Sequence, residues 1–415
     1  MSTTARTAPV TGRGLKLRWY ICGLLFFATT VNYIDRQVLG LLKPVISRDL
    51  HWTEADFGWI ISAFQVAYAI MMPLAGRLVD WIGPKRGYAI AVIFWSLAAM
   101  SHSLARSVVQ FATARFALGL GESANFPAAL RTVADWFPQN ERALATGIFN
   151  SGTNIGALVA PLAIPWITVR FGWRAAFLFT SALVLIWLVL WFTTYRHPPA
   201  AVVRADSTPA SRLPYTSLLT ERRTWAYLLG KVLTDPVWWF YLYWLPGFLD
   251  KSYGLNLSAM GAPLVAVYLL ADVGSVSGGW LSSSLLKRGF TANRARKTAM
   301  LVCAVVVTGV MFVPFTKGNL WLAVALIGLA AGAHQGWSAN LFTLPSDLFP
   351  QEAVGSVVGL GGLGGAISGA LVAPMVGYWL DFSHDAYGPL FVVAGSMYLI
   401  ALGLIHLIVP KLERR

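Results

Sequence analysis

Long apolar stretches separated by short polar segments make up most of the sequence. An α-helix needs roughly 20 residues to cross the hydrocarbon core of a bilayer, and each stretch is close to that length. The stretches lie near residues 19–42, 57–76, 87–105, 108–130, 142–168, 175–195, 224–249, 259–285, 298–315, 319–343, 353–379 and 388–409. The pattern therefore predicts an all-α, polytopic membrane protein with 12 transmembrane helices.

A short segment occurs twice, and its two copies are separated by nearly half of the chain. Asp135–Gln139 returns as Asp347–Gln351, a shift of 212 positions in a chain of 415 residues. Internal repeats of this kind are typical of transporters whose two halves enclose the substrate site. We therefore expect two pseudo-symmetric six-helix bundles. The expected divisions are an N-terminal tail at 1–18, the first bundle at 19–195, a linker at 196–223, the second bundle at 224–409 and a C-terminal tail at 410–415.

The distribution of charge predicts how the chain is oriented. Hydrophobic residues make up 56% of the chain and charged residues 12%, whereas soluble domains carry about 25% charged residues. If successive polar segments lie on alternate sides, the side with both termini carries 22 Lys and Arg and the other side carries 7. The positive-inside rule then places both termini and the linker in the cytoplasm. Because the net charge of +14 is spread over these segments, we expect a lipid bilayer and no nucleic acid as its partner.

Ionisable residues also lie inside the predicted membrane helices, where each costs about 2.5–3.5 kcal/mol to insert. Asp35 and Arg36 are adjacent, so they either form a pair that holds helices together or act on a substrate and a proton. Arg115 and Glu122 are about 10 Å apart along one helix, too far for a direct pair. An arginine binds a carboxylate through two parallel hydrogen bonds, and a carboxylate in a cavity can carry a proton. A hydrogen bond that packs helices is the alternative for Glu122.

The second half carries a more ambiguous set of ionisable residues. Lys231 and Asp235 share one helical face, where they form either a neutralising pair or a ligand site. Pro236 follows directly, and proline disfavours a helical conformation in the residue before it, so we expect the helix to break there. Asp272 has no local partner, and we expect it either to pair with Lys231 or to hydrate a cavity.

Amide, phenol and imidazole groups on the same helices suit a polyhydroxylated ligand, because each sugar hydroxyl both donates and accepts hydrogen bonds. Hydrogen bonds between helices are the alternative for any single amide. The candidate substrate-binding residues are Tyr33, Arg36, Tyr68, Arg115, Asn150, Asn154, Lys231, Trp238, His334, Gln335 and Asn340. The candidate proton-coupling residues are Asp35, Glu122, Asp235 and Asp272.

The polar segment between the second and third predicted helices resembles a signature of the major facilitator superfamily. Gly76–Arg86 fits the pattern G-x-L-x-D-x-x-G-x-[RK]-[RK], whereas its counterpart in the second half, Gly278–Arg288, lacks the acid. The resemblance implies that charges in such loops hold the cytoplasmic mouth shut. The candidate gating residues are Arg77, Asp80, Lys85, Arg86, Asp135, Arg142 and Asp347.

Within that superfamily, residues 17–410 resemble the anion:cation symporters, especially the hexuronate and galactonate transporters. The motifs that carry the resemblance are Asn32-Tyr33-x-Asp35-Arg36, Arg115-Phe116-x-x-Gly119-x-x-Glu122, Phe149-Asn150-Ser151-Gly152, Asp235-Pro236-x-Trp238 and Ala333-His334-Gln335. The resemblance implies proton-driven import of a sugar acid anion. It also implies that Asp35 and Glu122 couple the proton and that Tyr33, Arg36, Tyr68 and Arg115 hold the substrate. Hexuronates, aldonates and aldarates are all open as substrates.

Other classes of function fit the sequence less well. A carrier of an aromatic acid or phosphate, coupled to protons or sodium, is the alternative within transport. A membrane enzyme needs a nucleophile with a base, or metal ligands, and His334 alone offers neither. Cys22 and Cys303 lie far apart in apolar stretches, so we expect no disulfide framework and no metal site. We expect a monomer without a cofactor in a bacterial inner membrane.

Overall fold

The computed structural model describes residues 12–137, 139–196, 215–316 and 318–412, and within these ranges the regular elements are helices. The first half contains α1 (Gly12–Leu50), α2 (Glu54–Ile82), α3 (Pro84–Ser101), the 3-10 helix η1 (His102–Leu104), α4 (Val108–Glu122), α5 (Asn125–Trp136), α6 (Gln139–Phe171) and α7 (Trp173–Thr194). The second half contains α9 (Tyr215–Leu219), α10 (Arg222–Tyr253), α11 (Gly261–Lys287), α12 (Ala292–Val307), the 3-10 helix η3 (Thr308–Phe315), α13 (Leu320–Leu341), α14 (Leu344–Leu348), α15 (Gln351–Phe382) and α16 (Tyr387–Ile408).

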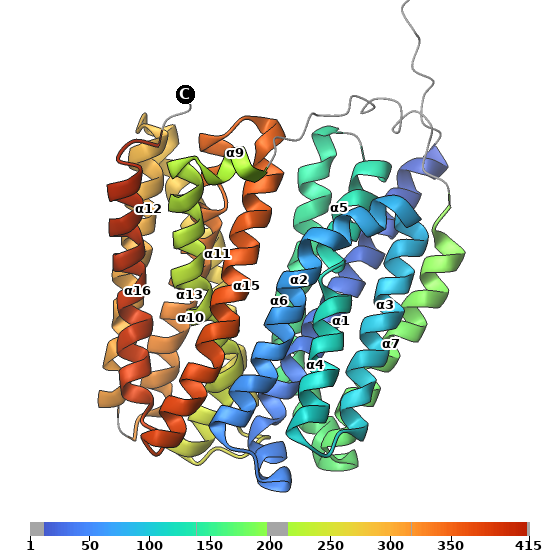
Figure 1. Cartoon of the computed structure of the whole chain (residues 1–415), viewed down its shortest axis with the longest axis vertical. Helices are drawn as coiled ribbons and strands as arrows, with labels where there is room; N and C mark the ends of the chain where they lie inside the picture. The colour runs from blue at the N-terminus through green and yellow to red at the C-terminus, as the bar shows by residue number, and fades with distance from the viewer. Residues whose placement is uncertain (1–11, 138, 197–214, 317, 413–415) are drawn as a thin grey trace, which may run out of the picture.

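The helices stand side by side in two bundles, α1–α7 and α10–α16 (Figure 1). The bundles contact each other through α2 against α15, α1 against α10, and α6 against α11. In the sequence repeat, α2 corresponds to α11 and α6 corresponds to α15. The α2–α15 contact and the α6–α11 contact are therefore equivalent. The start of α1 and the end of α16 lie at one end of the molecule, which we call the terminal end, and we call the opposite end the loop end (Figure 1).

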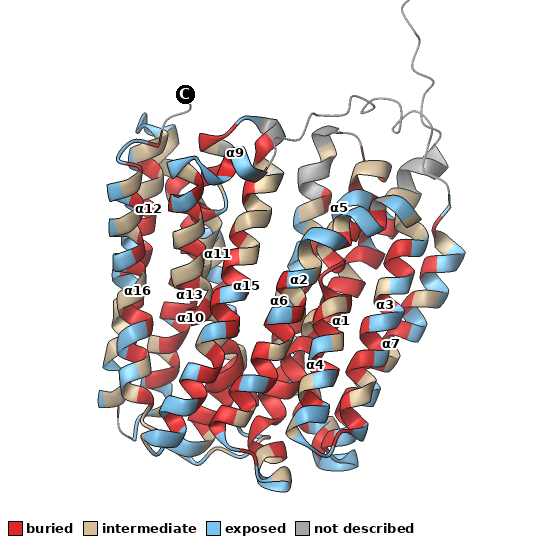
Figure 2. Ribbon diagram, in the orientation of Figure 1, coloured by how far each residue is buried: buried red, intermediate tan, exposed pale blue. Residues whose placement is uncertain are grey.

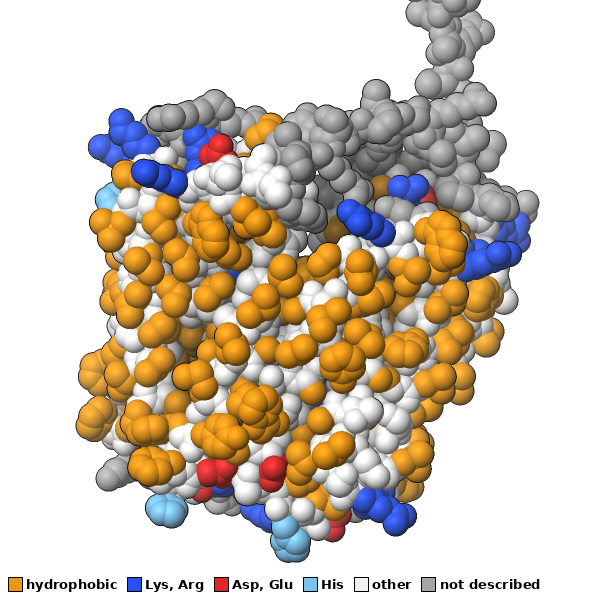
Figure 3. All heavy atoms as spheres, in the orientation of Figure 1, with side chains coloured by type: hydrophobic (Ala, Val, Ile, Leu, Met, Phe, Trp, Pro, Cys, Tyr) orange, Lys and Arg blue, Asp and Glu red, His pale blue; other side chains and the backbone are white. Residues whose placement is uncertain are grey.

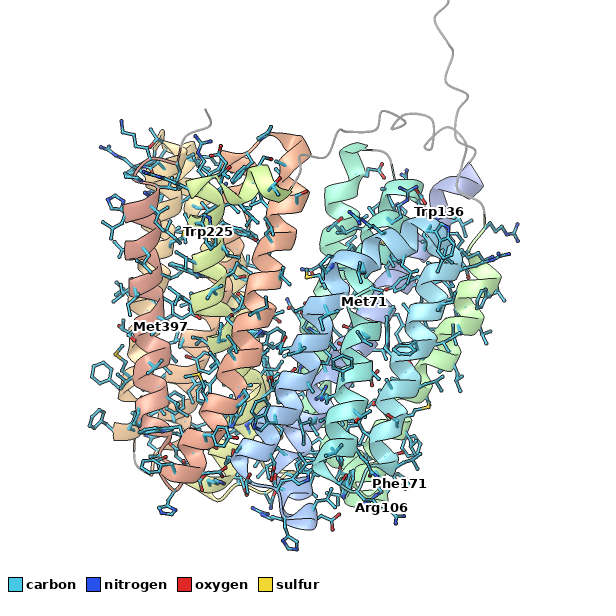
Figure 4. All side chains as sticks on the ribbon, viewed as in Figure 1. Met71, Arg106, Trp136, Phe171, Trp225 and Met397 are labelled. Atoms are coloured by element: carbon cyan, nitrogen blue, oxygen red, sulfur yellow. The ribbon has the colours of Figure 1, made fainter. Side chains whose placement is uncertain are left out.

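The outer surface is that of a protein solvated by lipid. Within the described residues, 9 helices are long and apolar enough to cross a membrane. Exposed hydrophobic side chains cover the middle of the molecule, and Lys and Arg gather at its two ends (Figure 3). Buried residues concentrate where the helices face one another (Figure 2). The terminal end is marked by Trp136 and Trp225 and the loop end by Arg106 and Phe171 (Figure 4). The chain is therefore a multi-pass membrane protein.

Two expectations about helix continuity were wrong. α10 runs without a break through Pro236, because a proline removes one backbone hydrogen bond, whereas a break inside a bilayer exposes several unpaired groups. The stretch 108–130 is not one helix, since α4 ends at Glu122 and α5 begins at Asn125. The break directly follows Glu122, a candidate proton-coupling residue. Most of the expected linker, residues 197–214, lies outside the described residues.

Glycines allow the two bundles to touch near the loop end. A Cβ on Gly58 would lie 2.6 Å from the carbonyl oxygen of Ala373, and a Cβ on Gly377 would lie 2.3 Å from that of Glu54. Real Cβ atoms do not approach backbone this closely, so only glycine permits α2 and α15 to pack backbone against backbone here. The bundles are therefore firmly closed against each other at the loop end.

Candidate functional site

The centre of the first bundle holds an ion pair between two predicted site residues. Nε and Nη2 of Arg36 on α1 donate hydrogen bonds of 2.9 and 2.7 Å to Oε2 of Glu122 on α4. The Arg36 side chain is 6% exposed and that of Glu122 is 0% exposed. Removing one partner of a buried pair costs about 3–5 kcal/mol, because the other charge is left without compensation. The pair therefore fixes α1 to α4 unless another anion or a proton replaces one of its members.

Aromatic rings surround the guanidinium group of Arg36. Its Cζ lies 5.1 Å from the ring centre of Tyr33, 5.3 Å from that of Tyr68 and 5.8 Å from that of Trp239. Phe64 is 5.1 Å away. Ring faces attract a cation, and this attraction partly compensates for its loss of water. Trp239 comes from α10, so the surroundings of Arg36 include both halves of the chain.

Arg115 lies beside Arg36, but its side chain is only partly bonded. Nη2 of Arg115 donates to the backbone oxygen of Arg36 at 3.1 Å. Its Nε and Nη1 have no hydrogen-bond partner among the described residues, although Arg115 is 1% exposed. The ring of Phe64 lies 5.6 Å from its Cζ. Buried N–H groups are nearly always paired in proteins, so these nitrogens indicate a position for water or an anionic ligand.

Asp35 is not paired with Arg36, its neighbour in the sequence, whose guanidinium binds Glu122 instead. Asp35 is 2% exposed. Ser181 on α7 donates a long hydrogen bond of 3.5 Å to its Oδ1, and its Oδ2 has no partner among the described residues. The two predicted carboxylates of the first bundle are thus both buried but lie in different settings, with Glu122 bound to a cation and Asp35 beside a hydroxyl.

The predicted residues of the second half form a separate cluster. Lys231 pairs with Asp235 at 2.8 Å. His334 stacks on Trp238, with ring centres 5.2 Å apart, and its Nδ1 lies 2.5 Å from the hydroxyl of Tyr398. These groups are bonded within their own bundle.

Of the remaining predicted polar residues, one joins two helices of the second bundle, and the others differ in exposure. The Asn340 amide donates to the backbone oxygens of Gly278 and Gly336, so it joins α13 to α11. Asn150 is exposed, whereas Asn154, Gln335 and Asp272 are half-buried. Among the described residues, Asp272 has no ion pair, and in particular it does not pair with Lys231.

The predicted gating residues lie at the terminal end, and their described contacts stay within one bundle. Nζ of Lys85 donates to the backbone oxygen of Tyr195 at 2.7 Å. Asp135 pairs with Arg131 at 3.3 Å, and Asp347 pairs with Arg296 at 3.0 Å. Arg77 and Arg86 are exposed, whereas the side chains of Asp80 and Arg142 lie outside the described part of the structure.

A polar network that the sequence did not indicate joins the two bundles at the loop end. Glu54, at the start of α2, accepts hydrogen bonds from Lys43 at 2.5 Å and, across the interface, from Lys251 at 3.1 Å and Trp244 at 3.2 Å. Asp381 of α15 caps α2, because its two oxygens accept from the backbone N–H groups of Glu54 at 2.8 Å and Ala55 at 2.7 Å.

Further bonds strengthen the same network. Arg48 binds both oxygens of Asp250 across the interface. Burial lowers the pKa of Lys251, but its hydrogen bond to Asp385 and the charge of Glu54 raise it by more, so the pKa lies above the usual lysine value. Lys251 therefore stays charged at neutral pH. Between described residues, the hydrogen bonds that join the bundles involve residues 54–62 of α2 or the last turns of α1 and α10.

Comparison with known proteins agrees with this architecture. A family model described as Major Facilitator Superfamily matches residues 25–373. The "Hexuronate transporter" of Escherichia coli (strain K12) is 32% identical over 402 residues, which cover 92% of each chain. The "Galacturonate transporter" of Dickeya chrysanthemi is 33% identical over 335 residues, or 76% of this chain and 96% of the relative.

A solved structure extends the comparison to the whole fold. The crystal structure of a D-xylose-proton symporter superposes with a TM-score of 0.77 at 14% sequence identity, covering 95% of this chain and 98% of the other. These relatives are transporters and not enzymes. The chain belongs to the Major Facilitator Superfamily and is a membrane transporter.

Proposed function

We propose that this protein is a proton-coupled symporter that imports a sugar acid anion by alternating access. The observation that carries the proposal is the pair of adjacent buried guanidinium groups, Arg36 and Arg115. A carboxylate is the partner of the first, and two nitrogens of the second have no partner among the described residues. A planar guanidinium suits the carboxylate of a sugar acid. The names of the hexuronate and galacturonate transporters, to which the chain is similar, support this class of substrate.

The Arg36–Glu122 pair supplies a physical route to coupling. Glu122 and the substrate carboxylate compete for the same cation, so substrate binds to Arg36 at the expense of the ion pair. A proton on Glu122 removes its charge and leaves Arg36 available to the substrate. Binding of the proton therefore increases the affinity for the substrate, and binding of the substrate increases the affinity for the proton. Symport requires this coupling. Asp35 is the second proposed proton site.

The rest of the site follows from the same proposal. Tyr33 and Tyr68 border the carboxylate position, and the amides of Asn150, Asn154 and Gln335 are available for the sugar hydroxyls. Lys231, Trp238, His334 and Asn340, together with Asp235 and Asp272, stay predicted contributors from the second half.

The network at the loop end supports alternating access between two membrane faces. We infer 12 membrane spans, because α1, the α4–α5 pair and α10 add three to the 9 apolar helices, and these three carry the buried charges of the proposed site. With both termini in the cytoplasm, the loop end faces the periplasm, and the described conformation is closed on that side. We propose bundles at 19–195 and 224–409, tails at 1–18 and 410–415, a linker at 196–223, and a monomer in the bacterial inner membrane.

Uptake by purified protein in liposomes tests the proposal. The vesicles carry a pH gradient, acidic outside, and receive glucuronate, galacturonate, galactonate, galactarate, benzoate or phosphate. We expect at least one sugar acid to accumulate, and accumulation to disappear when a protonophore dissipates the gradient. If benzoate or phosphate is transported and none of the sugar acids is, the assigned substrate class is refuted. Accumulation that depends on sodium but not on pH refutes proton coupling.

A further inference from the structure

One tyrosine of the second bundle reaches the arginines of the first. Tyr243 on α10 is 0% exposed, and its ring centre lies 6.0 Å from Cζ of Arg115. The ring stacks on Trp239, with centres 6.0 Å apart and planes 14° from parallel. Trp239 in turn lies against Arg36. Tyr243 and Trp239 therefore form an aromatic wall that the second bundle places against the proposed anion site.

Gly40 explains how α10 comes close enough. It follows Arg36 by one turn of α1. A Cβ on Gly40 would lie 3.1 Å from the carbonyl oxygen of Leu242 and 3.4 Å from Cα of Tyr243. A larger residue at this position would push α10 away from α1. Because Gly40 lies one turn from Arg36, this contact places the backbone of Tyr243 beside α1 only one helical turn from Arg36.

The hydroxyl of Tyr243 is buried without a partner among the described residues. The same holds for Nε and Nη1 of Arg115. A buried tyrosine hydroxyl normally finds a hydrogen-bond partner. All three unpaired groups can donate, and a carboxylate is an acceptor that can receive several such bonds at once. One acceptor between the two bundles can therefore satisfy all three groups, and a carboxylate is an acceptor of this kind.

We propose that Tyr243 is a substrate-binding residue whose hydroxyl donates a hydrogen bond to the carboxylate held by Arg115. The inference rests on the proposed function and adds a contact from the opposite bundle. Because Arg115 belongs to the first bundle and Tyr243 to the second, a carboxylate bound by both ties the two bundles together. Tyr243 thus contributes to affinity and favours the state in which the bundles enclose the substrate.

Tyr243→Phe tests this role, with Tyr241→Phe as a matched control. Tyr241 lies two residues earlier on α10, is 2% exposed and also has an unpartnered hydroxyl, but it has no ring contact with either arginine among the described residues. The readout is the dissociation constant, by calorimetry on purified protein, for the sugar acid that the wild-type protein binds. Loss of a hydrogen bond to a charged group weakens binding by about tenfold or more. We expect that loss in Tyr243→Phe and wild-type affinity in Tyr241→Phe.

The outcomes separate this inference from the proposed function. If the wild-type protein binds no sugar acid, the proposed function fails. If the wild-type protein binds one and Tyr243→Phe binds it equally well, or both variants lose affinity equally, the role of Tyr243 fails alone. If Tyr243→Phe cannot be purified, Tyr243→His and Tyr243→Leu replace it. The histidine variant keeps a donor and must bind more tightly than the leucine variant, so equal affinities contradict the inference.

Discussion

Asp381→Asn should open the loop end of the transporter. The carboxylate caps α2 across the interface through two hydrogen bonds, to the backbone of Glu54 and of Ala55. Loss of a capping side chain costs about 0.5–2 kcal/mol, and loss of a negative charge at a helix N-terminus costs about 0.3–1 kcal/mol at an exposed position. Asp381 is exposed, and asparagine keeps one acceptor oxygen. We therefore expect a shift of about 1–2 kcal/mol, or five- to thirty-fold in population.

The assay is the rate at which a cysteine at the interface reacts with a thiol reagent. Ser62 donates to the backbone oxygen of Ala370 at 2.7 Å and is 6% exposed, so Ser62→Cys is shielded while the bundles are closed. The native cysteines, Cys22 and Cys303, are replaced by alanine. A membrane-impermeant reagent added from the loop end then reacts in proportion to the open population. We expect a rate that is five- to thirty-fold higher in Asp381→Asn.

Asp56→Asn is the control for this experiment. Asp56 is an acid of the first turn of α2, and its side chain accepts a hydrogen bond from the backbone of Thr53 at 3.0 Å. That bond stays within the first bundle, and asparagine keeps an acceptor oxygen for it. We expect its labelling rate to match that of the unmodified protein. An unchanged rate in Asp381→Asn, or equal increases in both variants, would show that the cap across the interface does not hold the loop end closed.

Three further predictions concern the arginines, the second carboxylate and the terminal end. Arg115→Lys keeps the charge but loses the planar fork, so binding of the sugar acid should weaken more than tenfold, about 1.4 kcal/mol; calorimetry showing wild-type affinity would contradict this. Asp35→Asn should still bind substrate but lose accumulation driven by a pH gradient, and full accumulation would exclude Asp35 from coupling. Asp80→Asn should raise cysteine labelling from the terminal end without changing orientation, because acids contribute little to topology; unchanged labelling and transport would leave the loop as an orientation signal.

The sequence singled out the charged residues of the proposed site but not their partners. Arg36 and Glu122 could be selected because charges inside apolar stretches are costly. Their pairing joins positions 86 residues apart, and it depends on how α4 is rotated against α1. Local spacing carries no information about that rotation. The same limit applies to Tyr243, which appears in the sequence as one of several aromatic residues on α10.

The network at the loop end could not be predicted for a related reason. Thr53 and Asp56 form a capping box, which is a local signal for the start of α2. Glu54 appears in that context as an ordinary acid in a first helical turn. Its contact with Asp381 lies 327 residues away in the chain, and it exists because Gly58 and Gly377 let α2 and α15 pack closely. Contacts between the bundles can be identified only once the packing of the helices is known.

The central claim is that Glu122 couples the proton to the substrate, and Glu122→Gln in liposomes tests it most directly. Glutamine imitates the protonated acid, so exchange of labelled for unlabelled sugar acid should continue while accumulation against a gradient, driven by pH, disappears. Glu141→Gln is the control, because Glu141 is an acid of the same bundle that pairs with Arg18, outside the proposed site. Accumulation by Glu122→Gln at the wild-type level would contradict the account, as would loss of exchange together with accumulation.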